Sequence, residues 1–135
     1  MVKPGKTCRI VGLVIHVLIG ALLIFAGVMK LAGMVPPEAK EKMAAGIANN
    51  LMLIGAGELI TGILLIVPLT SSLGLLLATG FWGGVICTQM ADGGNFLAFS
   101  GFLLLTWVGG YLRDPSVLNS FTKCKPKEPV PASEG

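Results

Sequence analysis

The carboxylate of Glu58 lies well inside a hydrophobic segment that runs from Gly55 to Pro68. If this segment crosses a bilayer, a charge at that depth costs roughly 2.5–3.5 kcal/mol on insertion scales, so the group needs a partner, water or a bound proton. Glu58 comes about 8 residues after Asn50, which places it roughly 12 Å below the outer boundary at 1.5 Å per residue. Lys30 is expected near the same boundary, with its side chain leaning into the membrane, because helical side chains tilt toward the N-terminus. A lysine stem spans about 6 Å, so direct contact between Lys30 and Glu58 is marginal, and a bridging water is the expected link.

Two interpretations of this pair remain. The first is a structural ion pair, or a hydrogen-bonded carboxylic acid, that sets the register of two helices. The second is a site for a ligand, a substrate or a proton, which is the usual hypothesis for an ionisable residue inside a membrane.

Further polar residues are expected at the same outer level as Lys30 and Glu58. Cys87, Thr88 and Gln89 end the third hydrophobic segment, and Ser100 lies one turn into the fourth. Together with the pair they would line a polar pocket open to the outer side. Ordinary polarity at a membrane boundary is the alternative interpretation.

His16 and Trp107 are secondary candidates, expected at similar depth near the inner face. A histidine inside a membrane can bind a metal or haem or relay protons, but this chain has one histidine in all, which favours a hydrogen-bonded packing role. The three cysteines show no zinc spacing and no Cys-x-x-Cys pair, so no metal site is predicted. No phosphate-binding loop, nucleophile elbow or His-Glu-x-x-His motif is present, which argues against nucleotide and hydrolase chemistry.

The elements that would position these residues are membrane-spanning helices. The chain has 135 residues, of which 53% are hydrophobic and 13% charged, and a mean hydropathy of +0.81. This composition is far from that of a soluble domain. A span needs about 20 apolar residues. Four spans are predicted, over about 9–32, 47–67, 72–90 and 96–112.

These spans predict an all-α fold, an antiparallel four-helix transmembrane bundle over residues 1–121. A short surface helix is expected after Pro37, in the loop before the second span. The proline- and charge-rich segment 122–135 is predicted to be a disordered tail. Gly80 and Gly84 form a Gly-xxx-Gly face, where another helix is expected to approach closely.

The lysine and arginine distribution predicts both termini on the cytoplasmic side. Basic residues concentrate in the two terminal segments, while the loops on the other side carry Lys30, Lys40 and Lys42. The net charge of +3 comes without a basic stripe and interleaved aromatic residues, so no nucleic-acid partner is expected.

Several short motifs, in order, resemble the DoxX-like family of small bacterial inner-membrane proteins. They are Phe25-x-Gly27-x-x-Lys30, Gly57-Glu58-Leu59 running into Leu64–Pro68, Ser72-Leu73-Gly74, Ala78–Gly84, and Trp107 with Leu112-Arg113-Asp114-Pro115. The similarity covers about 8–118. The chain departs from the family pattern at Leu69, where an arginine is frequent, and at Gln89, where a histidine is frequent.

The resemblance implies a four-helix protein of the bacterial inner membrane, linked to thiol or sulfur redox metabolism or to quinone-coupled oxidoreductases. It allows a quinone as cofactor, redox proteins as partners and a homo-oligomer, and it leaves open whether the chain is itself an enzyme. Three hypotheses follow: a redox-system subunit with a polar pocket at Lys30 and Glu58, a small proton-coupled transporter or channel that uses Glu58, and a structural or assembly factor of a membrane complex.

Overall fold

The computed structural model describes residues 5–41, 43 and 45–115, and this part of the chain is helical with no strand. Its helices are α1 (Lys6–Leu31), α2 (Pro37–Glu41), α3 (Ala45–Asn49), α4 (Leu51–Ile66), α5 (Ser71–Ala91) and α6 (Phe96–Arg113). The predicted tail, 122–135, lies outside the described residues.

Three of the described helices, α1, α5 and α6, are long and apolar enough to cross a membrane, and α4 is a shorter apolar helix. The described part of the chain is all-helical and has the character of a membrane protein. The predicted second span, 47–67, is shorter in the structure because α3 ends at Asn49 and α4 begins at Leu51. The short surface helix expected after Pro37 is confirmed as α2, in which no residue is buried.

Local sequence signals explain where the long helices end. Gly33 and Gly93 both have φ of 69°, and each follows a helix C-terminus at the position where a left-handed residue is favoured. The amide of Met34 donates to the carbonyl of Met29, and that of Gly94 to the carbonyl of Gln89, which completes a Schellman motif after α1 and another after α5. α4 ends at Ile66 because Val67, which precedes Pro68, takes an extended conformation.

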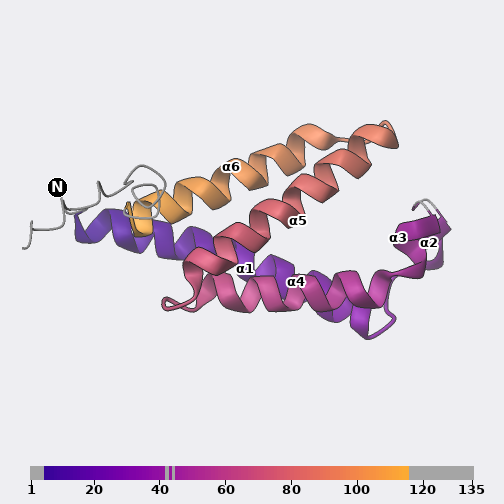
Figure 1. The fold of residues 1–135 in the computed structure, drawn as a ribbon, viewed down its shortest axis with the longest axis horizontal. Helices are drawn as coiled ribbons and strands as arrows, with labels where there is room; N and C mark the ends of the chain where they lie inside the picture. The colour runs from indigo at the N-terminus through magenta and orange to yellow at the C-terminus, as the bar shows by residue number, and fades with distance from the viewer. Residues whose placement is uncertain (1–4, 42, 44, 116–135) are drawn as a thin grey trace, which may run out of the picture.

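The long helices alternate in direction and form two arms (Figure 1). α4 runs antiparallel to α1 along most of its length, and α5 and α6 form a second antiparallel pair. The arms meet where α1 begins, α6 ends and the α4–α5 turn lies. They diverge toward the other end, so that the tip between α5 and α6 lies away from the start of α4 (Figure 1).

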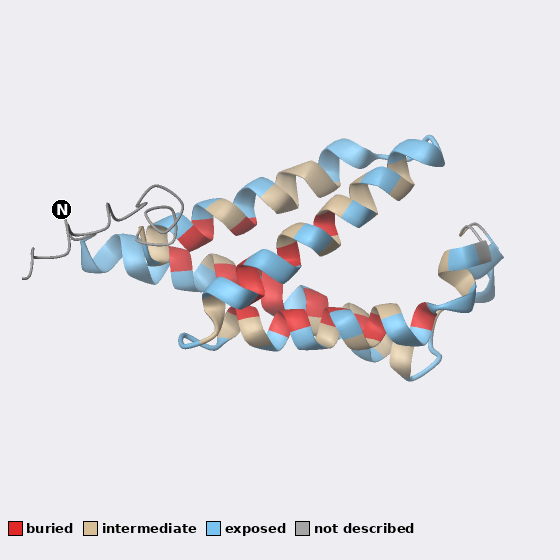
Figure 2. Ribbon diagram, in the orientation of Figure 1, coloured by how far each residue is buried: buried red, intermediate tan, exposed pale blue. Residues whose placement is uncertain are grey.

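The buried core lies where the arms meet and continues between α1 and α4 (Figure 2). It consists of Ile19, Leu23, Leu65, Leu75, Ala78 and Trp82. Trp82 stacks on Phe102 with 5.2 Å between ring centroids, which joins α5 to α6. Many large apolar side chains of the described helices are exposed, as expected for surfaces that face lipid.

Glycines let α1 and α4 approach closely. A Cβ at Gly20 would lie 2.9 Å from the Gly62 carbonyl oxygen, and one at Gly27 would lie 2.6 Å from the Gly55 carbonyl oxygen. Larger residues would therefore force these helices apart. The expectation for the Gly-xxx-Gly face of α5 is wrong within the described chain, because no atom lies within 4 Å of a Cβ built at Gly80 or Gly84. Both glycines lie on a face of α5 that points away from the other helices.

Candidate functional site

Lys30 and Glu58 form a direct ion pair between α1 and α4. The Lys30 ammonium donates to both carboxylate oxygens of Glu58, with Nζ 2.8 Å from Oε1 and 2.6 Å from Oε2. Glu58 is 3% exposed, whereas the Lys30 side chain keeps 18% of its surface accessible. The carboxylate is thus enclosed by protein, and the cation reaches it from the rim.

The helices position the pair by two local features. Glu58 belongs to the buried face of α4, together with Gly55, Thr61, Gly62 and Leu65, at the helical spacings that put residues on one side. A Cβ at Gly55, one turn before Glu58, would lie 2.9 Å from the Cβ of Lys30. Because Gly55 has no side chain, the lysine stem packs on its backbone and leans back along α1 to the carboxylate.

The remaining residues of the predicted outer pocket lie on the other arm. The Thr88 hydroxyl donates to the Val85 carbonyl and the Ser100 hydroxyl to the Phe96 carbonyl, so both bond within their own helices. Cys87 is exposed, and the carbonyl of Gln89 accepts the bond that ends α5. The structure does not bring these four residues to Lys30 and Glu58, because α5 and α6 diverge from α4 at this end (Figure 1).

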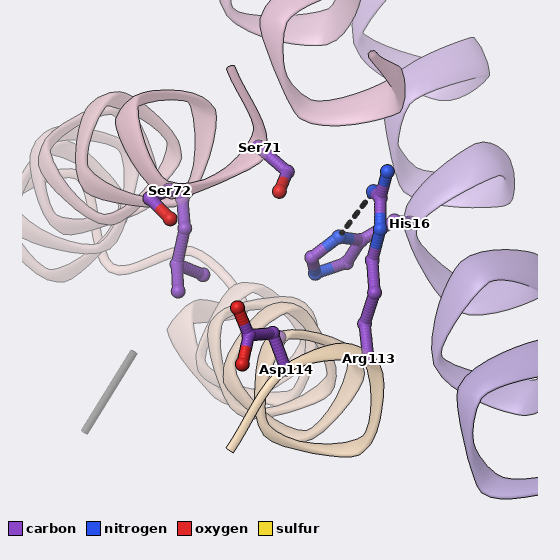
Figure 3. Close-up of a pocket in the computed structure, with 7 residues that line it drawn as sticks. His16, Ser71, Ser72, Arg113 and Asp114 are labelled. Carbon is purple, nitrogen blue, oxygen red and sulfur yellow. Dashed lines mark hydrogen bonds between the residues drawn. The ribbon is translucent and has the colours of Figure 1, made fainter. Parts of the chain in front are cut away.

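A second polar cluster forms where the two arms meet. His16, 1% exposed, has its Nε2 atom 3.1 Å from the Thr106 carbonyl oxygen. Its Nδ1 atom lies 3.3 Å from Nη1 of Arg113 (Figure 3). A guanidinium can only donate, so Nδ1 accepts and Nε2 carries the proton that is donated to Thr106. The contacts on both sides therefore favour a neutral imidazole in the Nε2–H tautomer.

Arg113 also binds the C-terminal end of α4. Nη1 donates to the Leu65 carbonyl at 3.0 Å and Nη2 to the Ile66 carbonyl at 3.2 Å. The last carbonyls of a helix have no partner within it and carry a partial negative charge. Arg113 satisfies two of them, and so ties the end of α6 to the end of α4 and to His16 of α1.

A small pocket of about 10 Å³ borders this cluster, which is roughly the room that one water requires. His16, Ser71, Ser72, Arg113 and Asp114 surround it (Figure 3), with Leu75 and Gly110 completing the lining. Trp107, predicted at the depth of His16, packs against the hydrophobic core. It is not part of the lining.

In the sequence, Arg113 stands out as a basic residue at the end of a span and as part of the motif Leu112-Arg113-Asp114-Pro115, and neither indicates its contacts. Its role could have been suspected from the face it shares with Thr106, Gly109 and Gly110, which are spaced as one side of a helix and are buried. The chemistry of the His16 cluster suits hydrogen bonding and the placement of a single water. Among the described residues, no group of three or more His, Cys, Asp or Glu side chains could hold a metal ion.

Comparison with known proteins found no matching family model, no similar curated protein and no similar solved structure.

Proposed function

We propose that this chain is a multi-pass subunit of a membrane redox system, thiol-, sulfur- or quinone-linked, as its resemblance to the DoxX-like family implies. The observation that carries the proposal is the buried Lys30–Glu58 ion pair between two apolar helices. Ionisable groups in such surroundings are costly, and inside a membrane they are by default candidates for proton or substrate sites. Glu58 would hold a proton during turnover, and Lys30 would set the charge of the site.

We further propose that α4 crosses the membrane as a fourth span. It lies beside α1 for most of its length and connects the far end of α1 to the start of α5 (Figure 1). Its 16 residues extend about 24 Å at 1.5 Å per residue. That length is a few ångströms short of a typical hydrocarbon core, a mismatch that local thinning of the bilayer accommodates at modest cost. The lysine and arginine distribution then supports an inner-membrane protein with both termini in the cytoplasm.

The experiment is a comparison of thiol-dependent quinone reduction in membranes that contain the full chain or a Glu58→Gln variant. The substitution is nearly isosteric and removes the titratable group, so the rate should fall strongly while the amount of folded protein stays similar. Glu41→Gln on the exposed helix α2 is the matched control and should keep the wild-type rate. A rate that is the same with and without the protein, or unchanged by Glu58→Gln, would refute the proposal.

A second candidate function, a structural or assembly factor, is favoured by how fully the two charges satisfy each other. Both carboxylate oxygens of Glu58 accept from Lys30, and neither residue lines either of the two hollows described for this fold. In that case Glu58→Gln should weaken the folded bundle and its association with partner proteins. Unfolding and co-purification measurements on the same variant separate the two functions.

A further inference from the structure

A hollow of about 380 Å³ opens at the start of α1, where basic and apolar side chains face the same space. Its lining consists of Lys6, Arg9, Ile10, Leu13, Pro68 and Arg113. Arg9, Ile10 and Leu13 follow Lys6 by three, four and seven positions, which places the four residues on one face of α1. Pro68 belongs to the α4–α5 turn and Arg113 ends α6, so three separate parts of the chain form the walls.

The basic groups of this hollow are well placed to attract an anion. Arg113 is held by the carbonyls of Leu65 and Ile66, so its charge is fixed in position. No salt bridge joins Lys6 or Arg9 to a carboxylate in the described part of the chain. Asp114 lines the small pocket beside His16 and not this hollow.

The deeper wall of the hollow is apolar and open. Ile10 is 60% and Leu13 40% exposed, and both lie in a helix that is long and apolar enough to span the membrane. A free phosphate ion would gain nothing from this wall, whereas an acyl chain would be sheltered by it. The basic rim matches the phosphate of an anionic phospholipid, and the apolar wall matches one of its acyl chains.

We propose that this hollow binds an anionic phospholipid, with the phosphate at Lys6, Arg9 and Arg113 and the upper acyl chain along Ile10 and Leu13. Guanidinium and ammonium groups donate charge-assisted hydrogen bonds to phosphate oxygens. Basic pockets beside membrane helices attract anionic headgroups for the same reason. The lipid would contact α1, the α4–α5 turn and α6 together, and so brace the end at which the arms meet.

The test uses the full chain, purified in a neutral detergent and titrated with short-chain phosphatidylglycerol, phosphatidylcholine or inorganic phosphate. Retained lipid is counted by native mass spectrometry, and thermal stability is measured in parallel. Phosphatidylglycerol should be retained at least tenfold more tightly than phosphatidylcholine and should raise the melting temperature. Lys6→Gln with Arg9→Gln should abolish this preference. The exchange Lys6→Arg with Arg9→Lys, which keeps both charges, should preserve it.

The matched control, Lys40→Gln with Lys42→Gln, removes the same charge from the sequence between α1 and α4 and should leave the preference intact. Equal loss of the preference for phosphatidylglycerol in both charge-removing variants would overturn the proposal, because the net charge of the protein would then explain the preference. Equal retention of both lipids by the wild-type chain would also overturn it. So would stabilisation by inorganic phosphate as strong as that by phosphatidylglycerol, since the site would then recognise a free anion and not a lipid.

Discussion

Glu58 shows at the scale of one residue how a charge is accommodated between apolar helices. Both of its oxygens accept from Lys30, and the neighbouring Gly55 leaves room for the lysine stem. Removing one partner of such a pair leaves the other uncompensated in a poorly solvated place. The two residues should therefore be energetically coupled.

If the pair is structural, Lys30→Met and Glu58→Gln should each lower the free energy of unfolding; if it is a functional site, Glu58→Gln should keep a stability close to that of the wild type and lose activity. Loss of one partner from a buried pair costs about 3–5 kcal/mol in soluble proteins. The cost should be smaller here, because Glu58 can take up a proton and Lys30 can extend outward to water. The free energy of unfolding should fall less in the double variant than the sum of the decreases in the two single variants. Unfolding in detergent–denaturant mixtures measures all three variants, and strict additivity would show that the residues are not coupled.

Arg113→Met should destabilise the junction of the arms. The substitution removes the donor to the carbonyls of Leu65 and Ile66 and to Nδ1 of His16. Hydrogen bonds that involve a charged group contribute about 1.5–3 kcal/mol each, so a loss of a few kcal/mol is expected. Unfolding midpoints provide the measurement, with Lys40→Met on the exposed helix α2 as a control that should change little. A silent Arg113→Met would mean that water replaces these bonds at no cost.

At the scale of the elements, the α1–α4 contact depends on glycines seven residues apart on each helix. Gly20 faces Gly62, and Gly27 faces Gly55. Close backbone contact of this kind is a main source of helix association in lipid. Apolar side chains gain little free energy by leaving lipid for a helix interface, because both environments are apolar.

Gly62→Leu should therefore lower the melting temperature in detergent strongly, since its Cβ would lie 2.7 Å from the Gly20 carbonyl oxygen. Gly84→Leu makes the same change on α5 where no atom lies within 4 Å of the new Cβ, and it should be nearly silent. Thermal unfolding of the two variants side by side is the measurement. Similar decreases in the melting temperature of both variants would indicate that Gly84 packs against a second copy or a partner in the membrane.

At the scale of the whole molecule, the alternating direction of the long helices makes the membrane topology testable. With four spans and both termini inside, a reporter fused after Gly135 should be cytoplasmic and one inserted within 36–45 should be periplasmic. Paired alkaline phosphatase and fluorescent-protein fusions give opposite signals on the two sides. If both positions report the same side, α4 does not cross.

Much of the helical architecture could be predicted from the sequence, because each long helix coincides with an uninterrupted apolar run. The exception is the start of the predicted segment 47–67, where the short helix α3 is separate from α4. Proximity of Lys30 and Glu58 was also predictable, from depth along the helix and the lean of a helical side chain. The other residues of the predicted pocket lie on an arm that diverges from the pair, which spacing along the chain does not reveal.

Which segments are helical, and where glycine and proline end them, could be read from the sequence, since these properties depend on neighbours within a few turns. The packing of the helices reveals what the sequence does not: Arg113 binds the end of α4, Gly62 and not Gly84 meets another helix, and the arms diverge beyond their junction. These features depend on how side chains from distant segments interlock, which sets the crossing of helices. Spacing along one helix shows which residues share a face, but the facing helix decides what that face contacts.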